Sequence, residues 1–256
     1  MNYFIDTEFL EGTQKAFFGK TKPTIDLISI GIVSEDSREY YAISKDFNLK
    51  EAWNRWQQRT GEGDRNNTEP RLYWLRENVL KPIYKELHNK ENLTARQAFH
   101  RCNIYIPETE FKFTYSNFKK LINKYGKTNK QIAEEVKVFC TGDVLSIEKA
   151  KFYEVQHKPF NFYGYYSAYD HVVLCWLFGK MIDLPTGFPR YTIDLKQELD
   201  LKARAILILN MKGAEHFEGA LQHLKALSTY PFQTNEHNAL SDARFNRDLY
   251  KFLQNI

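Results

Sequence analysis

Two acidic residues, Asp6 and Glu8, directly follow an apolar segment near the N-terminus. If residues 3–5 form a strand, alternation of side chains places both carboxylates on one face, about 7 Å apart. Two carboxylates on one face can share a hard cation such as Mg²⁺. An Asp-x-Glu pair often arises by chance and usually marks a solvated edge, but here Phe9 and Leu10 follow instead of a polar turn. Burial of an ionised carboxylate among apolar residues costs free energy, and binding of a metal ion is one way to offset this cost.

Three further residues with useful chemistry lie where helices are predicted to begin. Asp170 comes three residues after Ser167, in the first turn of a helix that follows a strand at residues 160–165. There it either complements the helix dipole or joins a site at the end of the strand. His237 lies in the loop before the final helix and Asp242 in its first turns, so both can approach one site. A lone histidine is more often a surface or packing residue than a base, so this pair alone does not define a site.

Short segments rich in β-branched and aromatic residues predict the strands that carry these side chains. The predicted strands span residues 3–5, 25–33, 39–44, 160–165 and 191–195. The polar residues 35–38 form a short connection, which favours an antiparallel meander of the first three strands. The predicted helices span residues 49–87 with a break at 60–70, 129–140, 167–178, 196–228 and 238 onwards. This order is typical of an α/β sheet covered by helices.

The chain is predicted to form one domain over residues 1–256, with a helical or irregular insertion at about 88–125, where charges are frequent and no apolar period is visible. Trp53, Trp56 and Trp74 are interpreted as core anchors in preference to base-stacking platforms.

Composition indicates a soluble globular protein, because 43% of the residues are hydrophobic and 27% are charged. The net charge of +4 is compatible with a polyanionic partner but falls short of the basicity of dedicated nucleic-acid-binding proteins. Cys102, Cys140 and Cys175 form no CxxC pair, which argues against a zinc ribbon or a disulfide framework. With no signal peptide and no apolar run of membrane-spanning length, the sequence predicts a cytoplasmic location.

Three strings, in this order, resemble the DEDDh superfamily of 3′-5′ exonucleases: FIDTEF at residues 4–9, YDH at 169–171 and HNALSDAR at 237–244. Within it the chain most closely resembles the polyadenylate-specific exoribonuclease AS family. The supporting strings are DTEFLE at 6–11, LISIGIV at 27–33, EYYAIS at 39–44 and AYDHV at 168–172. The resemblance is poor over residues 88–125 and 200–234.

The resemblance implies a ribonuclease H-like fold in which the four acids hold two divalent metal ions, Mg²⁺ or Mn²⁺, and His237 is the general base. The acids are Asp6, Glu8, Asp170 and Asp242. It implies release of 5′-mononucleotides from the 3′ end of single-stranded RNA, a preference for adenylate-rich RNA, and a homodimer. Tyr169, Arg190 and Arg244 are candidate substrate-binding residues. The lysines at positions 119, 120, 124 and 127 either meet phosphates or form a solvated helix face.

Two alternatives stay open at this level. A DNA or oligonucleotide 3′-5′ exonuclease of the same superfamily would differ in contacts to the 2′-hydroxyl group, which no motif here identifies. A catalytically silent nucleic-acid-binding module would use the same fold without hydrolysis. The complete set of four acids and a histidine argues against the silent module, since binding alone does not require it.

Overall fold

The computed structural model describes residues 1–15, 21–56, 72–100, 109–142, 159–208 and 216–256. The predicted break at 60–70 and Cys102 lie outside the described residues. The chain divides into two compact units. The first comprises Met1–Glu8, Ser29–Ala42 and Asn129–Ile256, and the second comprises Phe9–Ile28 and Ile43–Thr128.

Five strands form one mixed sheet in the order β3-β2-β1-β4-β5. They are β1 (Asn2–Lys15), β2 (Thr21–Ser34), β3 (Glu39–Ile43), β4 (Asn161–Gly164) and β5 (Thr192–Asp194). β1 pairs in parallel with β4, and β4 in parallel with β5. The connections from β1 to β2 and from β2 to β3 are too short for a parallel crossover, so these strands are antiparallel. The predicted meander and the predicted α/β class with a mixed sheet flanked by helices are confirmed.

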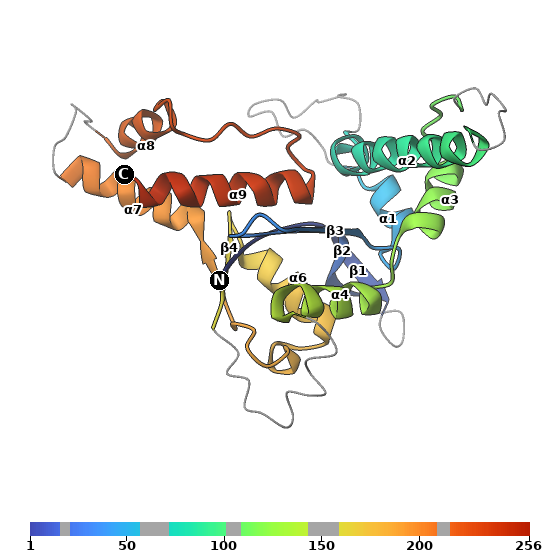
Figure 1. Cartoon of the computed structure of the whole chain (residues 1–256), viewed down its shortest axis with the longest axis horizontal. Coiled ribbons are helices and arrows are strands. Elements are labelled where there is room, and N and C mark those ends of the chain that lie inside the picture. The colour runs from blue at the N-terminus through green and yellow to red at the C-terminus, as the bar shows by residue number, and fades with distance from the viewer. Residues whose placement is uncertain (16–20, 57–71, 101–108, 143–158, 209–215) are drawn as a thin grey trace. The chain divides into compact units, whose positions relative to one another are not determined.

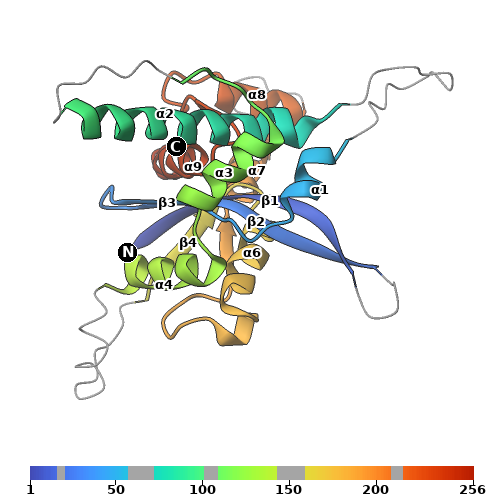
Figure 2. The ribbon, with the colours of Figure 1, turned by 90° about the vertical axis from the view of Figure 1, so that its right-hand side faces the viewer.

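Helices cover both faces of the sheet in the first unit (Figure 1, Figure 2). One face carries α9 (Ala239–Gln254), and the opposite face carries α4 (Asn129–Thr141) and α6 (Ala168–Phe178). The ring of Phe4 lies 5.3 Å from that of Tyr250 on α9, whereas the ring of Tyr3 lies 5.8 Å from that of Phe139 on α4. Because side chains alternate along a strand, Asp6 and Glu8 share the α9 face with Phe4.

The core on the α9 side also includes α7 (Leu195–Ile208) and α8 (Phe217–Lys225). Leu195, Leu199 and Ala203 of α7 pack with Leu249 and Leu253 of α9. These two helices lie within the predicted helical stretch 196–228. A short 3-10 helix, η3 (Met181–Asp183), follows α6. None of the helices among the described residues has the length and apolar character needed to cross a membrane.

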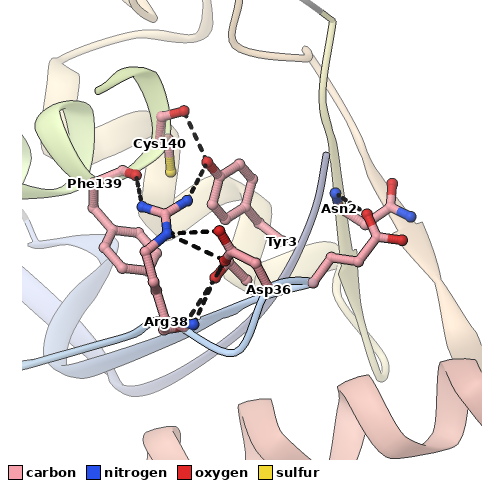
Figure 3. A network of polar contacts seen from close by, with 8 residues as sticks. Asn2, Tyr3, Asp36, Arg38, Phe139 and Cys140 are labelled. Carbon is pink, nitrogen blue, oxygen red and sulfur yellow. Dashed lines mark hydrogen bonds and ion pairs between the residues drawn. The ribbon is translucent and has the colours of Figure 1, made fainter. Parts of the chain in front are cut away.

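A polar network fixes the start of β1 and the β2–β3 connection to the end of α4 (Figure 3). The Tyr3 hydroxyl donates to the backbone carbonyl of Cys140 at 2.9 Å. The Arg38 guanidinium donates to the carbonyl of Phe139 at 3.2 Å and to Asp36 at 3.0 Å, and its carbon lies 5.1 Å from the centre of the Phe139 ring. This network fixes β1 at Tyr3, three residues before Asp6, the first of the predicted metal ligands.

The second unit contains α1 (Leu49–Asn54), a π-helix η2 (Arg76–Leu80), α2 (Lys81–His100) and α3 (Tyr115–Tyr125). The ring of Trp53 packs against Phe113 at 4.8 Å and Phe118 at 6.4 Å, which confirms its role as a core anchor. Trp56 is about half exposed, so its predicted role as a core anchor is wrong. The described part of the predicted insertion at 88–125 is mostly helical, because α2 continues to His100 and α3 begins at Tyr115.

Gly31 of β2 permits a close approach between the sheet and α9. A Cβ atom at this position would lie 2.3 Å from the backbone oxygen of Ala239 and 2.5 Å from the Cα atom of Leu240. Both atoms belong to the first turn of α9 and are backbone, so they cannot move aside as a side-chain tip would. The absence of a side chain at Gly31 therefore sets the position of the turn that carries Asp242.

The substitution Gly31→Ala should lower the free energy of unfolding by about 1–3 kcal/mol, because the new methyl group forces α9 away from β2. Urea denaturation measures this loss. Ser29→Ala is the matched control on the same strand, since it removes only a buried hydroxyl group that has no hydrogen-bond partner among the described residues. Equal stability of the Gly31→Ala variant and the parent would contradict the close approach.

Candidate active site

Three carboxylates converge on the α9 face of the sheet. Asp6 and Glu8 project from β1, and Asp242 projects from the first turn of α9. One carboxylate oxygen from each lies within 4.8 Å of the others, a spacing that suits shared ligation of a cation. The structure thus brings together three of the five predicted site residues.

Asp170 approaches the same stretch of β1 from α6. Its Oδ1 atom accepts hydrogen bonds from the backbone N–H of Thr7 at 2.8 Å and from the Thr7 hydroxyl at 2.6 Å. Thr7 lies between Asp6 and Glu8 and therefore faces the α6 side. Asp170 is buried, and its carboxylate ties the start of α6 to the strand of the two acids.

His237 lies beside Asp242 in the loop that precedes α9. Its backbone N–H donates to Asp242 Oδ2 at 2.9 Å, and the Gln233 side-chain amide donates to Asp242 Oδ1 at 2.8 Å. His237 has a φ of 67°, in the left-handed region that non-glycine residues rarely adopt. Asn238 caps α9 by accepting from the Ser241 N–H at 3.1 Å. The loop is therefore closed onto the carboxylate of Asp242.

Buried polar contacts fix the backbone next to Asp6. The side-chain amide of Asn246 on α9 donates to the backbone oxygen of Ile5 at 3.0 Å, and Asn246 is almost fully buried. On the other side of β1, a Cβ atom at Gly164 would lie 3.1 Å from the same Ile5 oxygen. β1 is thus held from α9 and from β4 at the residue before its first acid.

Sequence reasoning missed Thr7, Gln233 and Asn246. The only sequence signal for Asn246 was its position on the final helix, where a polar amide lies among the apolar residues Phe245 and Leu249. Thr7 is the middle residue of the Asp-Thr-Glu string, where only the two acids carried a signal. Gln233 carried no signal, because its contact with Asp242 depends on the path of the loop.

Without a bound cation, the surroundings of these four acids disfavour their ionised forms. Desolvation raises the pKa of Glu8 to about 8, with further contributions from the charges of Asp242 and Asp170. Desolvation, followed by the charges of Asp170, Glu8 and Asp242, also raises the pKa of Asp6. The pKa of Asp170 rises to about 6 through desolvation, although the hydrogen bonds from Thr7 oppose the rise.

Burial likewise raises the pKa of Asp242, against the hydrogen bonds from Gln233 and His237. A bound cation would neutralise this repulsion, and ligands with oxygen donors alone suit hard divalent ions. The residues present therefore fit a divalent metal site.

The predicted substrate-binding residues lie at the surface. Tyr169 is half exposed beside Asp170 on α6, and Arg190 is exposed before β5. Arg244 forms two hydrogen bonds with Glu39, at 2.7 and 2.6 Å, so phosphate binding by Arg244 would require this ion pair to open. In the second unit, Lys124 pairs with Glu91 at 2.8 Å.

The raised pKa values predict how stability depends on pH in the presence of a chelator. The folded protein keeps protons on these acids at pH values where the unfolded chain, with carboxyl pKa values of about 4, has released them. Each such group therefore destabilises the fold progressively as the pH rises, up to about pH 8 for Glu8.

Glu8→Gln removes one of these groups, so its advantage in unfolding free energy over the parent should grow from about pH 4 to about pH 8. Urea denaturation in chelator measures the difference. Glu11→Gln, which changes an exposed acid of the same strand, is the matched control. A constant difference for Glu8→Gln would contradict the desolvated cluster.

Comparison with known proteins identifies the family of this chain. The chain is 28% identical over 197 residues to the 3'-5' exoribonuclease Rv2179c of Mycobacterium tuberculosis (strain ATCC 25618 / H37Rv), a match that covers 77% of this chain and 73% of that protein. The 3'-5' exoribonuclease MT2234.1 of strain CDC 1551 / Oshkosh matches with the same identity and coverage. The family model of the 3'-5' exoribonuclease Rv2179c-like domain matches residues 1–254, so the chain belongs to this family of enzymes.

Proposed function

We propose that this chain is a metal-dependent 3′-5′ exoribonuclease of the DEDDh type, which removes 5′-mononucleotides from the 3′ ends of single-stranded RNA. The convergence of Asp6, Glu8 and Asp242 is the observation that carries the proposal. The printed activity of the two mycobacterial relatives supports RNA as the substrate. The family match over residues 1–254 supports one exonuclease domain, 1–256, that includes both units.

In this proposal Asp6, Glu8, Asp170 and Asp242 hold two divalent ions, Mg²⁺ or Mn²⁺. Their crowding and desolvation favour a cation-bound state over four free carboxylates. When bound, such ions stabilise the charge that develops on the reacting phosphate. Thr7 would keep Asp170 in a fixed orientation through its two hydrogen bonds.

His237 is the proposed general base. It accepts a proton from the attacking water, whose oxygen bonds to phosphorus while the bond from phosphorus to the 3′ oxygen breaks. The departing 3′ oxygen takes up a proton, and a 5′-mononucleotide leaves. The left-handed backbone at His237 and its bond to Asp242 support this role, since strained residues held by their surroundings gather at functional sites.

Finer features of the proposal rest on the resemblance to the polyadenylate-specific exoribonuclease AS family. They are the preference for adenylate-rich RNA and the homodimer. The proposed cytoplasmic location rests instead on the three separate cysteines, which form no CxxC pair. Tyr169 and Arg190 are proposed to contact the substrate from the exposed surface beside α6 and β5. Arg244 joins them only if its ion pair with Glu39 opens.

The direct test uses RNA labelled at its 5′ end, with a free 3′ hydroxyl group. It should shorten in a ladder with Mg²⁺ or Mn²⁺ and stay intact in excess chelator or when the 3′ end is blocked, because the site acts at that end. Asp6→Asn should abolish turnover and leave cooperative unfolding intact, since the change removes a ligand charge but little volume.

Asp248→Asn is the matched control, because Asp248 lies on α9 but forms a surface ion pair with Arg247 at 2.9 Å. This variant should keep parental activity. Internal cleavage of circular RNA would contradict an exonuclease, and shortening of DNA at the same rate would favour the DNA alternative.

Substitution of His237 should lower turnover by roughly a hundredfold to ten-thousandfold at saturating metal, because proton transfer belongs to the transition state. His237→Asn is the sharper variant, since asparagine tolerates the left-handed backbone while lacking a base. His237→Ala also removes the base, but alanine is strained in the left-handed backbone conformation at this position. Single-turnover rates and RNA affinity are measured together, and near-parental turnover in the Asn variant would refute the general-base role.

Competition tests the base preference. In an equal mixture of oligoadenylate and oligouridylate, the adenylate should disappear first if the resemblance to the AS family extends to its substrate. Equal rates would leave the exoribonuclease proposal standing and remove the narrower preference. The two oligomers should have equal length and the same 5′ label, so that chain length and end chemistry do not enter the comparison.

A further inference from the structure

Two aromatic side chains stand exposed on the segments that carry the acidic cluster. Tyr166 is 65% exposed and Phe232 is 88% exposed. Single exposed apolar side chains are ordinary on protein surfaces and need no function. Tyr166 and Phe232 differ from such isolated side chains, because hydrogen bonds near the acidic residues hold the chain segments to which they belong.

Tyr166 occupies the turn between β4 and α6, four residues before Asp170. Its φ of 56° is left-handed, and its backbone N–H donates to Asp194 Oδ1 at 3.3 Å. The Lys196 ammonium lies 5.8 Å from the centre of its ring and adds positive charge beside it. The ring is thus presented to solvent from a fixed turn at the end of the strand that pairs with β1.

Phe232 precedes Gln233, whose amide binds the Asp242 carboxylate at 2.8 Å. The same loop is closed by a bond from the Asn238 N–H to the Asn235 oxygen at 3.1 Å. It is closed again by the bond from the His237 N–H to Asp242. Phe232 therefore directly precedes a residue that contacts the cluster, while almost its whole side chain is exposed to solvent.

A row of buried and partly buried rings runs from Tyr166 to Tyr230, which lies two residues before Phe232. Tyr166 contacts Tyr165 at 4.9 Å between ring centres, and Tyr165 lies 6.3 Å from Phe245 of α9. Phe245 lies 6.4 Å from Tyr230, two residues before Phe232. Phe245 is three residues after Asp242, so the row passes close to the first turn of α9. The exposed ring of Tyr166 lies at one end of the row, and the exposed Phe232 lies two residues beyond the other end.

We propose that Tyr166 and Phe232 bind bases at the 3′ end of single-stranded RNA by stacking. This inference rests on the proposed function and adds base-binding positions to it. Aromatic faces stack on unpaired bases of any sequence, which suits an enzyme that removes successive nucleotides. A ring on a well-held backbone loses less freedom when a base binds than a ring on a loose segment, so exposure on an anchored turn favours affinity.

The test compares two RNAs of equal length, one with normal bases and one with abasic units at the last two positions. Phe232→Ala and Tyr166→Ala should each lower kcat/KM on normal RNA by roughly 5- to 150-fold, the range expected for one stacked base. On the abasic RNA the same variants should resemble the parent. The loss should appear mainly in KM, and in the affinity of an Asp6→Asn background for RNA.

Conservative variants separate stacking from general apolar contact. Phe232→Tyr and Tyr166→Phe keep a ring and should restore near-parental rates, whereas Phe232→Leu should not. Trp176→Ala is the matched control, because Trp176 is half exposed at the end of α6 away from Asp170.

The outcomes distinguish this inference from the proposed function. A parent that does not shorten RNA overturns both. A parent that shortens RNA, with Ala variants that are unchanged or equally impaired on both RNAs, overturns only the stacking role. Rates restored by Phe232→Leu would also overturn it, because leucine provides apolar area without an aromatic face.

Discussion

Repulsion among desolvated carboxylates is the constraint on which the first unit depends. Asp6, Glu8 and Asp242 lie so close together that their ionised carboxylates would repel one another, and burial raises the pKa of each. Their elements must therefore be held by contacts that do not depend on the acids themselves. The buried bond from Asn246 to Ile5 and the close approach at Gly31 supply such contacts. The aromatic and polar contacts of Tyr3 with α4 add another at the start of β1.

Local sequence pattern predicted much of this arrangement. The five strands, their meander and the final helix follow from apolar period and short polar connections, which are local properties. The placement of Asp6 and Glu8 on one face follows from alternation alone. For residues 88–100 the sequence left helical and irregular structure open, because apolar positions become sparse after Leu87 and tertiary packing decides the state.

Long-range contacts mark the limit of that reasoning. The sequence allowed Asp170 either to complement the helix dipole or to join a site. Neither interpretation predicted its hydrogen bonds from Thr7, which is 163 residues away. The same holds for the amide of Asn246 and the backbone oxygen of Ile5, 241 residues apart. The family is confirmed at the level of 3'-5' exoribonuclease, whereas the DEDDh assignment and the resemblance to the AS family rest on short strings and stay predictions.

The alternation of β1 has a consequence for insertions and deletions. The string Asp6-Thr7-Glu8 contacts two layers at once, with the acids on the α9 side and Thr7 bound to Asp170 of α6. Loss or gain of one residue between Phe4 and Glu8 would slip the register and exchange the faces of all three side chains. Homologous chains should therefore vary in length at the ends of β1 and hardly at all within these five positions.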